Sequence, residues 1–222
     1  MDPGTSARPN WREVAAAVCT GVLHLAFKSV GLHGTFVLIA GLGWAAFVIR
    51  RASTQRGILL EWGFRADNLL RAFGVAAFLS LPAFVAMALI PEKPGNLQFC
   101  SRVLPLLVLY PVWGVIQQFL VQGLVVRNVT MTRLGSIRPL VVIAGASLFA
   151  LVHVPQIPLM VATFAMGVLF VPLYLAYHNL WPLGVFHGWL GAMFYAWVLH
   201  QDPWSDFLAT VGPGILRCLT PP

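Results

Sequence analysis

Charged residues are scarce in this sequence of 222 residues: Asp, Glu, Lys and Arg make up only 9%, whereas 59% of the residues are apolar. A soluble domain carries about 25% charged and about 45–50% apolar residues. The scarcity of charge excludes an ordinary soluble enzyme and a disordered regulator. The short alternating segments of a β-barrel are also missing, because the apolar runs are long and unbroken. The sequence therefore predicts an all-α, polytopic transmembrane bundle that forms one integral membrane domain, residues 1–222.

Cysteine is rare, and carboxylates are absent from a long stretch. Cys19, Cys100 and Cys218 share no short spacing, so no zinc knuckle or disulfide framework is indicated. Between Glu92 and Asp202 there is no Asp or Glu. Any histidines in that stretch would lack carboxylate partners for a catalytic zinc. We therefore expect no metal and no other cofactor.

Hydropathy predicts about seven membrane helices, since each needs about 20 residues. The expected spans are 13–30, 33–49, 69–90, 103–127, 139–154, 159–177 and 182–199. A short interfacial helix is expected within 50–68, where apolar residues interrupt the charges, and the tail 200–222 is expected at the surface.

The net charge of +7 is explained by topology, so we expect no nucleic-acid partner. With the N-terminus inside, ten basic residues fall in inner segments and four in outer ones. Because Lys and Arg collect in cytoplasmic loops, the sequence predicts a cytoplasmic N-terminus in a membrane of the bacterial inner-membrane type. The ten inner residues are Arg8, Arg12, Arg50, Arg51, Arg56, Arg65, Arg71, Arg127, Arg133 and Arg138, and the four outer ones are Lys28, Lys93, Arg102 and Arg217.

Polar residues interrupt three of the expected spans, where hydrocarbon should exclude them. The span 103–127 carries three glutamines, the span 139–154 carries a histidine four residues after a phenylalanine, and the span 182–199 carries a histidine four residues before a glycine. These residues are Gln117, Gln118, Gln122, Phe149, His153, His187 and Gly191. Glutamines can simply bridge packed helices by hydrogen bonds, and a polar pocket is the alternative. Helical rise places Gln118 and His187 in the inner half of the bilayer and His153 deeper.

The order and spacing of these residues resemble the CPBP family of intramembrane endopeptidases, also called the CAAX protease and bacteriocin-processing (ABI) family. The similarity covers about 100–195. The family's E-E-x-x-x-R reads Gln117, Gln118 and Gln122 here, its F-x-x-x-H matches Phe149 and His153, and its third motif is His187 with Gly191 in place of Asn, Asp or His.

The resemblance implies a glutamate that activates water, with His and Asn assisting. In this chain both glutamates, the arginine and the Asn are replaced, and an amide cannot act as a general base. Because the glutamates and the arginine of the motif are replaced together by glutamine, the site keeps neutral hydrogen-bonding side chains and no unpaired buried charge remains.

Three functions remain open at this stage. The first is a variant endopeptidase in which His153 or His187 is the base, and the second is a non-catalytic protein that binds a membrane-associated or lipidated peptide. The third is a small transporter or proton relay, which the lack of intramembrane carboxylates disfavours. Membrane lipids are expected partners, and the oligomeric state is open.

Overall fold

The computed structural model describes residues 8–90 and 99–201, with side chains from 106 in the second range, and this described part contains helices and no strand. The all-α prediction is therefore confirmed. The predicted tail 200–222, apart from its first two residues, the loop that holds Lys93, and Arg217 lie outside the described residues, as does the Arg102 side chain. The helices are α1 (Trp11–Ser29), α2 (His33–Thr54), α3 (Ile58–Trp62), α4 (Leu69–Ala88), α5 (Phe99–Gln118), α6 (Arg127–Thr130), α7 (Arg138–Leu151), α8 (Ile157–Tyr177) and α9 (Leu180–Met193). Two π-helical segments, Phe119–Val126 and Phe194–Val198, and a 3₁₀ turn at Arg133–Ser136 complete the described elements.

Every expected span corresponds to a helix, but the helices differ in whether their length and hydropathy are sufficient to cross a membrane. Four helical stretches in the described residues are long and apolar enough to cross one: His33–Thr54, Leu69–Ala88, Leu106–Thr130 and Ile157–Tyr177. Helix α1 carries three charged residues, while α7 and α9 have 14 residues each. Length and composition therefore support four of the seven expected spans, and the other three depend on packing within the bundle.

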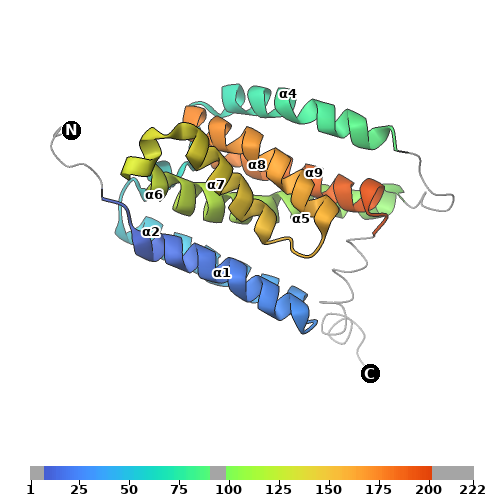
Figure 1. Ribbon diagram of the computed structural model, residues 1–222, viewed down its shortest axis with the longest axis horizontal. Coiled ribbons are helices and arrows are strands. Elements are labelled where there is room, and N and C mark those ends of the chain that lie inside the picture. Colours follow the sequence, from blue (N-terminus) through green and yellow to red (C-terminus); the bar gives the residue numbers. More distant parts are fainter. Residues whose placement is uncertain (1–7, 91–98, 202–222) are drawn as a thin grey trace.

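The centre of the bundle is formed by α5, α7, α8 and α9, with α4 along one side and the α1–α2 pair along the other (Figure 1). Helix α5 packs on α9 and α7 packs on α8. In its most apolar window only 6% of α2 is buried inside the protein, against 44% of α8. Most of the α2 surface therefore faces away from the protein, and apolar side chains exposed in this way would be unfavourable in water.

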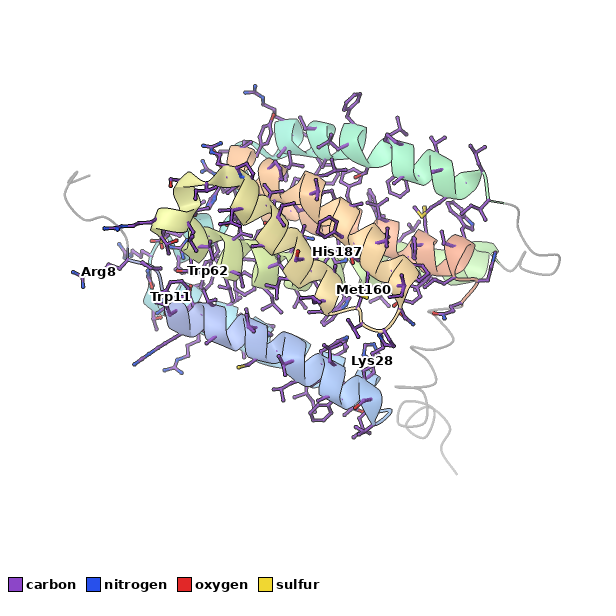
Figure 2. All side chains as sticks on the ribbon, viewed as in Figure 1. Arg8, Trp11, Lys28, Trp62, Met160 and His187 are labelled. Carbon is purple, nitrogen blue, oxygen red and sulfur yellow. The ribbon has the colours of Figure 1, made fainter. Side chains whose placement is uncertain are left out.

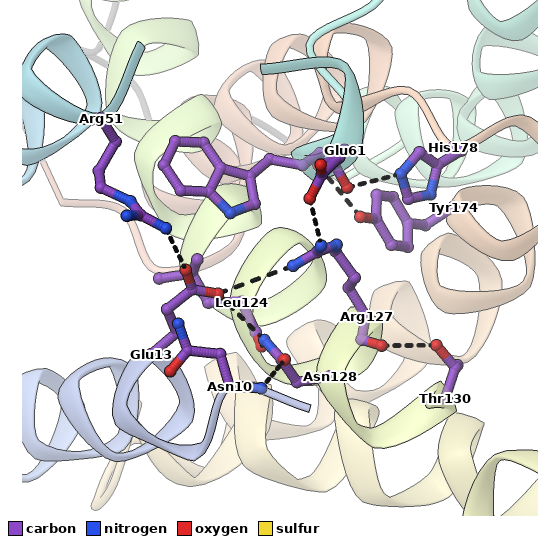
Figure 3. A network of polar contacts seen from close by, with 11 residues as sticks. Asn10, Glu13, Arg51, Glu61, Leu124, Arg127, Asn128, Thr130, Tyr174 and His178 are labelled. Carbon is purple, nitrogen blue, oxygen red and sulfur yellow. Dashed lines mark hydrogen bonds and ion pairs between the residues drawn. The ribbon is translucent and has the colours of Figure 1, made fainter. Parts of the chain in front are cut away.

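Polar contacts gather where α1 and α6 begin and α2 ends, beside α3 (Figure 3). Arg127 Nη2 donates to Glu61 Oε2 over 2.8 Å, and Arg127 Nη1 lies 3.7 Å from Glu13 Oε2. Asn128 Nδ2 donates to the same Glu13 oxygen over 3.2 Å, and Arg51 Nη2 lies 3.9 Å from Glu13 Oε1. We call Glu13, Arg51, Glu61, Arg127 and Asn128 the arginine clamp, because they connect α1, α2, α3 and α6 through charged groups.

The same end of the bundle is closed by contacts between the α3–α4 loop and the α8–α9 turn. Asn68 Nδ2 donates to Tyr177 O over 2.6 Å, and Asn179 Nδ2 donates to Asn68 Oδ1 over 2.7 Å. Leu180 N–H donates to Gly63 O over 2.8 Å. Consecutive helices alternate in direction, so all ten arginines assigned to inner segments lie at this end. The cytoplasmic location of this end stays a prediction.

Candidate functional site

Two of the predicted site residues meet in the centre of the bundle, where Figure 2 labels His187. Gln118 is the last residue of α5 and His187 lies in the middle of α9. Gln118 Nε2 lies 3.4 Å from His187 Nδ1, and the two residues are 1% and 6% exposed. The amide donates a long hydrogen bond if Nδ1 is unprotonated, in which case the ring carries its proton on Nε2. The two motifs, 69 residues apart in sequence, are in direct contact.

The close approach of α5 and α9 depends on three glycines. A Cβ on Gly114 would lie 2.8 Å from Gly188 N, and one on Gly184 would overlap the Val115 side chain. A Cβ on Gly188 would overlap the backbone of Tyr110 and Pro111. Gly184 and Gly188 form a G-x-x-x-G pattern, which lets the backbones of membrane helices touch. This pattern was not predicted from the sequence, although it surrounds His187, and it brings that ring to Gln118.

Gln122 lies in the π-helical segment Phe119–Val126 and not in a continuous α-helix as expected for 103–127. The N–H of Arg127 donates to Gln122 O, five residues back. Gln122 is 1% exposed, and the Oε1 atoms of both Gln118 and Gln122 are buried without a hydrogen-bond partner. An unsatisfied buried acceptor costs about 1–3 kcal/mol, and π turns are frequent at functional sites. Gln118 thus brings an unpartnered amide oxygen to the buried histidine, and Gln122 carries a second such oxygen four residues further along the chain.

Phe149 lies between the two predicted histidines. Its ring meets the His187 ring edge-on at a centroid distance of 4.9 Å and the His153 ring at 5.7 Å. His153 Nδ1 donates to Phe149 O over 2.9 Å, so its proton is on Nδ1 and the Nε2 lone pair is free when the ring is neutral. His153 follows the end of α7 and is half-buried. Its ring and that of His187 thus both pack on the Phe149 ring.

The remaining two motif residues lie beside this contact. Gln117 is half-buried on α5. Gly191 lies one turn beyond His187, where an added Cβ would meet Tyr110 Cδ1 at 3.9 Å, an ordinary packing distance. The Cβ of a larger residue at position 191 would therefore fit without a clash, whereas a Cβ at Gly188 would clash with the α5 backbone.

The site is electrically neutral and closed. No carboxylate occurs anywhere between Glu92 and Asp202. Within residues 8–90 and 99–201, no three His, Cys, Asp or Glu residues come together to hold a metal. Gln118 and His187 are both buried, and neither lines the cavity between α1 and α2 or the one beside Arg138 and Leu175.

Residues 101–193 match a family model described as type II CAAX prenyl endopeptidase Rce1-like. No curated protein and no solved structure matches the chain. The matched segment contains all the motif residues, from Gln117 on α5 to Gly191 on α9, and it leaves out α1, α2 and α4. The resemblance read from the motifs is thus confirmed for this segment: residues 101–193 are similar to the Rce1-like family of type II CAAX prenyl endopeptidases.

Proposed function

We propose that this chain is a catalytically impaired member of the family, which binds a membrane-embedded or lipidated peptide at the Gln118–His187 contact without hydrolysing it by the family's glutamate mechanism. The observation that carries the proposal is that contact itself. It joins two motifs of the family inside the membrane bundle, in a stretch of chain with no carboxylate.

The loss of hydrolysis follows from acid–base chemistry. A positioned general base typically contributes 10²–10⁴-fold to a rate, and the Gln118 amide cannot accept the proton of an attacking water. The resemblance assigns the base to the position that Gln117 or Gln118 occupies here. A glutamate restored alone would be a buried charge without a partner, which costs several kcal/mol. Restoring activity therefore also requires Gln122→Arg, which supplies the motif's arginine.

Retained binding is supported by the two unpartnered amide oxygens. Gln118 Oε1 and Gln122 Oε1 are buried acceptors. The backbone N–H groups of an extended peptide are donors of matching geometry, and in hydrocarbon such donors must find a partner. Rotation of the Gln118 amide would place Oε1 on His187 Nδ1 in its other tautomer. The pair can therefore present either an acceptor or a donor to a bound segment.

A second candidate function, hydrolysis with a histidine base, is favoured by one observation. The hydrogen bond from His153 Nδ1 to Phe149 O fixes the ring and leaves Nε2 as an acceptor. This is the orientation that a general base requires. In that case His153 would act from the far side of Phe149.

The test compares binding with cleavage of a farnesylated peptide by the purified protein in micelles. We expect the unaltered chain to bind the peptide and to leave it intact, and Gln118→Ala to weaken binding. The combination Gln117→Glu, Gln118→Glu, Gln122→Arg and Gly191→Asn should restore cleavage, with Gly191→Ala alone as the folding control. No restoration in a folded combination variant would contradict the assignment of the motif positions.

The two histidine variants separate the candidate functions. Under the proposal, His153→Ala and His187→Ala alter binding or stability while turnover stays absent. Cleavage by the unaltered chain that declines as the pH falls and is lost in His153→Ala would establish the second candidate. Cleavage that survives the loss of both histidines would refute both.

A further inference from the structure

A long groove lies between α1 and α2, outside the segment that matches the family. Its volume is about 610 Å³. It runs between two antiparallel helices, with Arg12 and Arg51 at the arginine-clamp end and Leu23 and Phe36 at the other. From Arg12 to Leu23 the helical rise is about 16 Å, which is about half the 30 Å thickness of the hydrocarbon core. The groove therefore spans one leaflet.

The walls of the groove are apolar apart from its charged end. Gly43 leaves a hollow, because a Cβ placed there would have no neighbour within 4 Å. Trp44 borders the groove with its indole N–H donated to Thr20 Oγ1 over 3.2 Å. With that donor satisfied, the ring presents only apolar surface. The length and lining suit an extended hydrocarbon chain.

The charged end has an excess of cation over anion. Arg12 is exposed, and Arg51 Nε is buried without a hydrogen-bond partner. Glu13 is the one carboxylate in the lining, and its oxygens are engaged by Asn128, Arg127 and Arg51 within the arginine clamp. Arg12 is thus available to an anion, and Arg51, which has an unpartnered Nε donor, lines the same end. Guanidinium groups bind phosphate oxygens with matched geometry.

We propose that the α1–α2 groove binds one anionic phospholipid, with its phosphate at Arg12 and Arg51 and an acyl chain along Gly43 and Trp44. The volume lies within the 300–1,000 Å³ of small-molecule sites, whereas a docked helix is about 10 Å wide. A zwitterionic lipid would leave the net positive charge of the groove end unmatched. A second copy of the chain would bring further arginines to the same end.

The experiment measures lipid binding to the purified full chain by native mass spectrometry, with phosphatidylglycerol and phosphatidylcholine of identical acyl chains. We expect one tightly retained phosphatidylglycerol and at least fivefold weaker retention of phosphatidylcholine, because each arginine near a lipid surface is worth about fivefold in binding. Arg12→Gln should weaken phosphatidylglycerol binding about fivefold. Arg50→Gln on the exposed side of α2, outside the groove lining, should leave it unchanged.

A second variant tests the apolar part without altering charge. Gly43→Leu fills the hollow and should abolish retention of either lipid, whereas Gly74→Leu on α4, where an added Cβ also has open space, should not. Equal retention of the two lipids, or binding that survives Gly43→Leu, would overturn the proposal. So would a dimer that dissociates in Gly43→Leu, since a second copy would then occupy the groove.

Discussion

Replacing Gly188 with alanine tests how the Gln118–His187 contact is maintained. The new methyl group would overlap the backbone of Tyr110 and Pro111 on α5. A backbone cannot move aside as the end of a flexible side chain can, so α5 and α9 must separate. Overpacking of this kind costs about 1–3 kcal/mol, while Gly→Ala inside a helix returns about 0.5–1 kcal/mol. We expect a net loss of about 1–2 kcal/mol in the free energy of unfolding.

Gly191→Ala is the matched control on the same helix. Its methyl group would lie 3.9 Å from Tyr110 Cδ1, so only the helix-propensity gain remains. We expect this variant to be as stable as the original or up to about 1 kcal/mol more stable. The two substitutions have the same chemistry and are less than one turn apart, yet they should change stability in opposite directions.

The assay is unfolding of the purified protein in mixed micelles by increasing SDS fraction, followed by far-UV circular dichroism. Separation of α5 from α9 should also lengthen the 3.0 Å hydrogen bond from Trp189 Nε1 to Leu107 O, which crosses the same interface. The reasoning is refuted if Gly188→Ala unfolds at the same SDS fraction as Gly191→Ala, because the helices would then not depend on glycine for their approach.

Three further predictions concern the arginine-clamp end. Glu13→Gln should lower the free energy of unfolding by about 1–3 kcal/mol, because Glu13 is buried between two arginines. Glu61→Gln should cost less than about 1 kcal/mol, because the Glu61 side chain is 47% exposed. Equal costs in SDS unfolding would contradict this. Burial lowers the pKa of His178 below 6.5, so the unfolded chain binds a proton at a higher pH than the folded one, and stability should decline as the pH falls below about 6.5. His178→Asn, which suits the left-handed backbone at that position (φ 49°), should flatten the decline between pH 7.5 and 5.5. Finally, reporter fusions after residues 50 and 95 should give an internal and an external signal respectively, and the reverse pattern would place the N-terminus outside.

The sequence predicted the helices well because their ends carry strong local signals. Helix α8 was expected at 159–177 and is found at Ile157–Tyr177, since Pro158 suits the first turn of a helix. Helix α2 was expected at 33–49, ending before Arg50 and Arg51, but continues to Thr54. Arginines near the C-terminus of a helix stabilise it through the helix dipole, so they extend the last turn and do not end it.

The site was predictable only in part, because its geometry depends on contacts between distant helices. Gln118 and His187 were expected to converge and are in contact, whereas His153 contacts the Phe149 ring, which also packs on His187. The contact between Asn128 and Glu13 joins residues 115 positions apart. No local pattern predicts such a pairing, since isolated Asp and Glu near a helix start usually read as solvated or dipole-compensating charges.

The π-helical segment Phe119–Val126 determines the angle, measured around the helix axis, between Gln118 before it and Arg127 after it. Gln118 before it turns toward α9, and Arg127 and Asn128 after it turn toward α1 and α3. Each residue of an α-helix advances the chain by about 100°. Deleting one residue within the segment, which would convert the wide turn to a regular one, keeps Gln118 against His187 and rotates Arg127 by about 100° away from Glu13. The one extra residue therefore lets a single helix place Gln118 in the buried amide site and Arg127 at the charged end of the bundle.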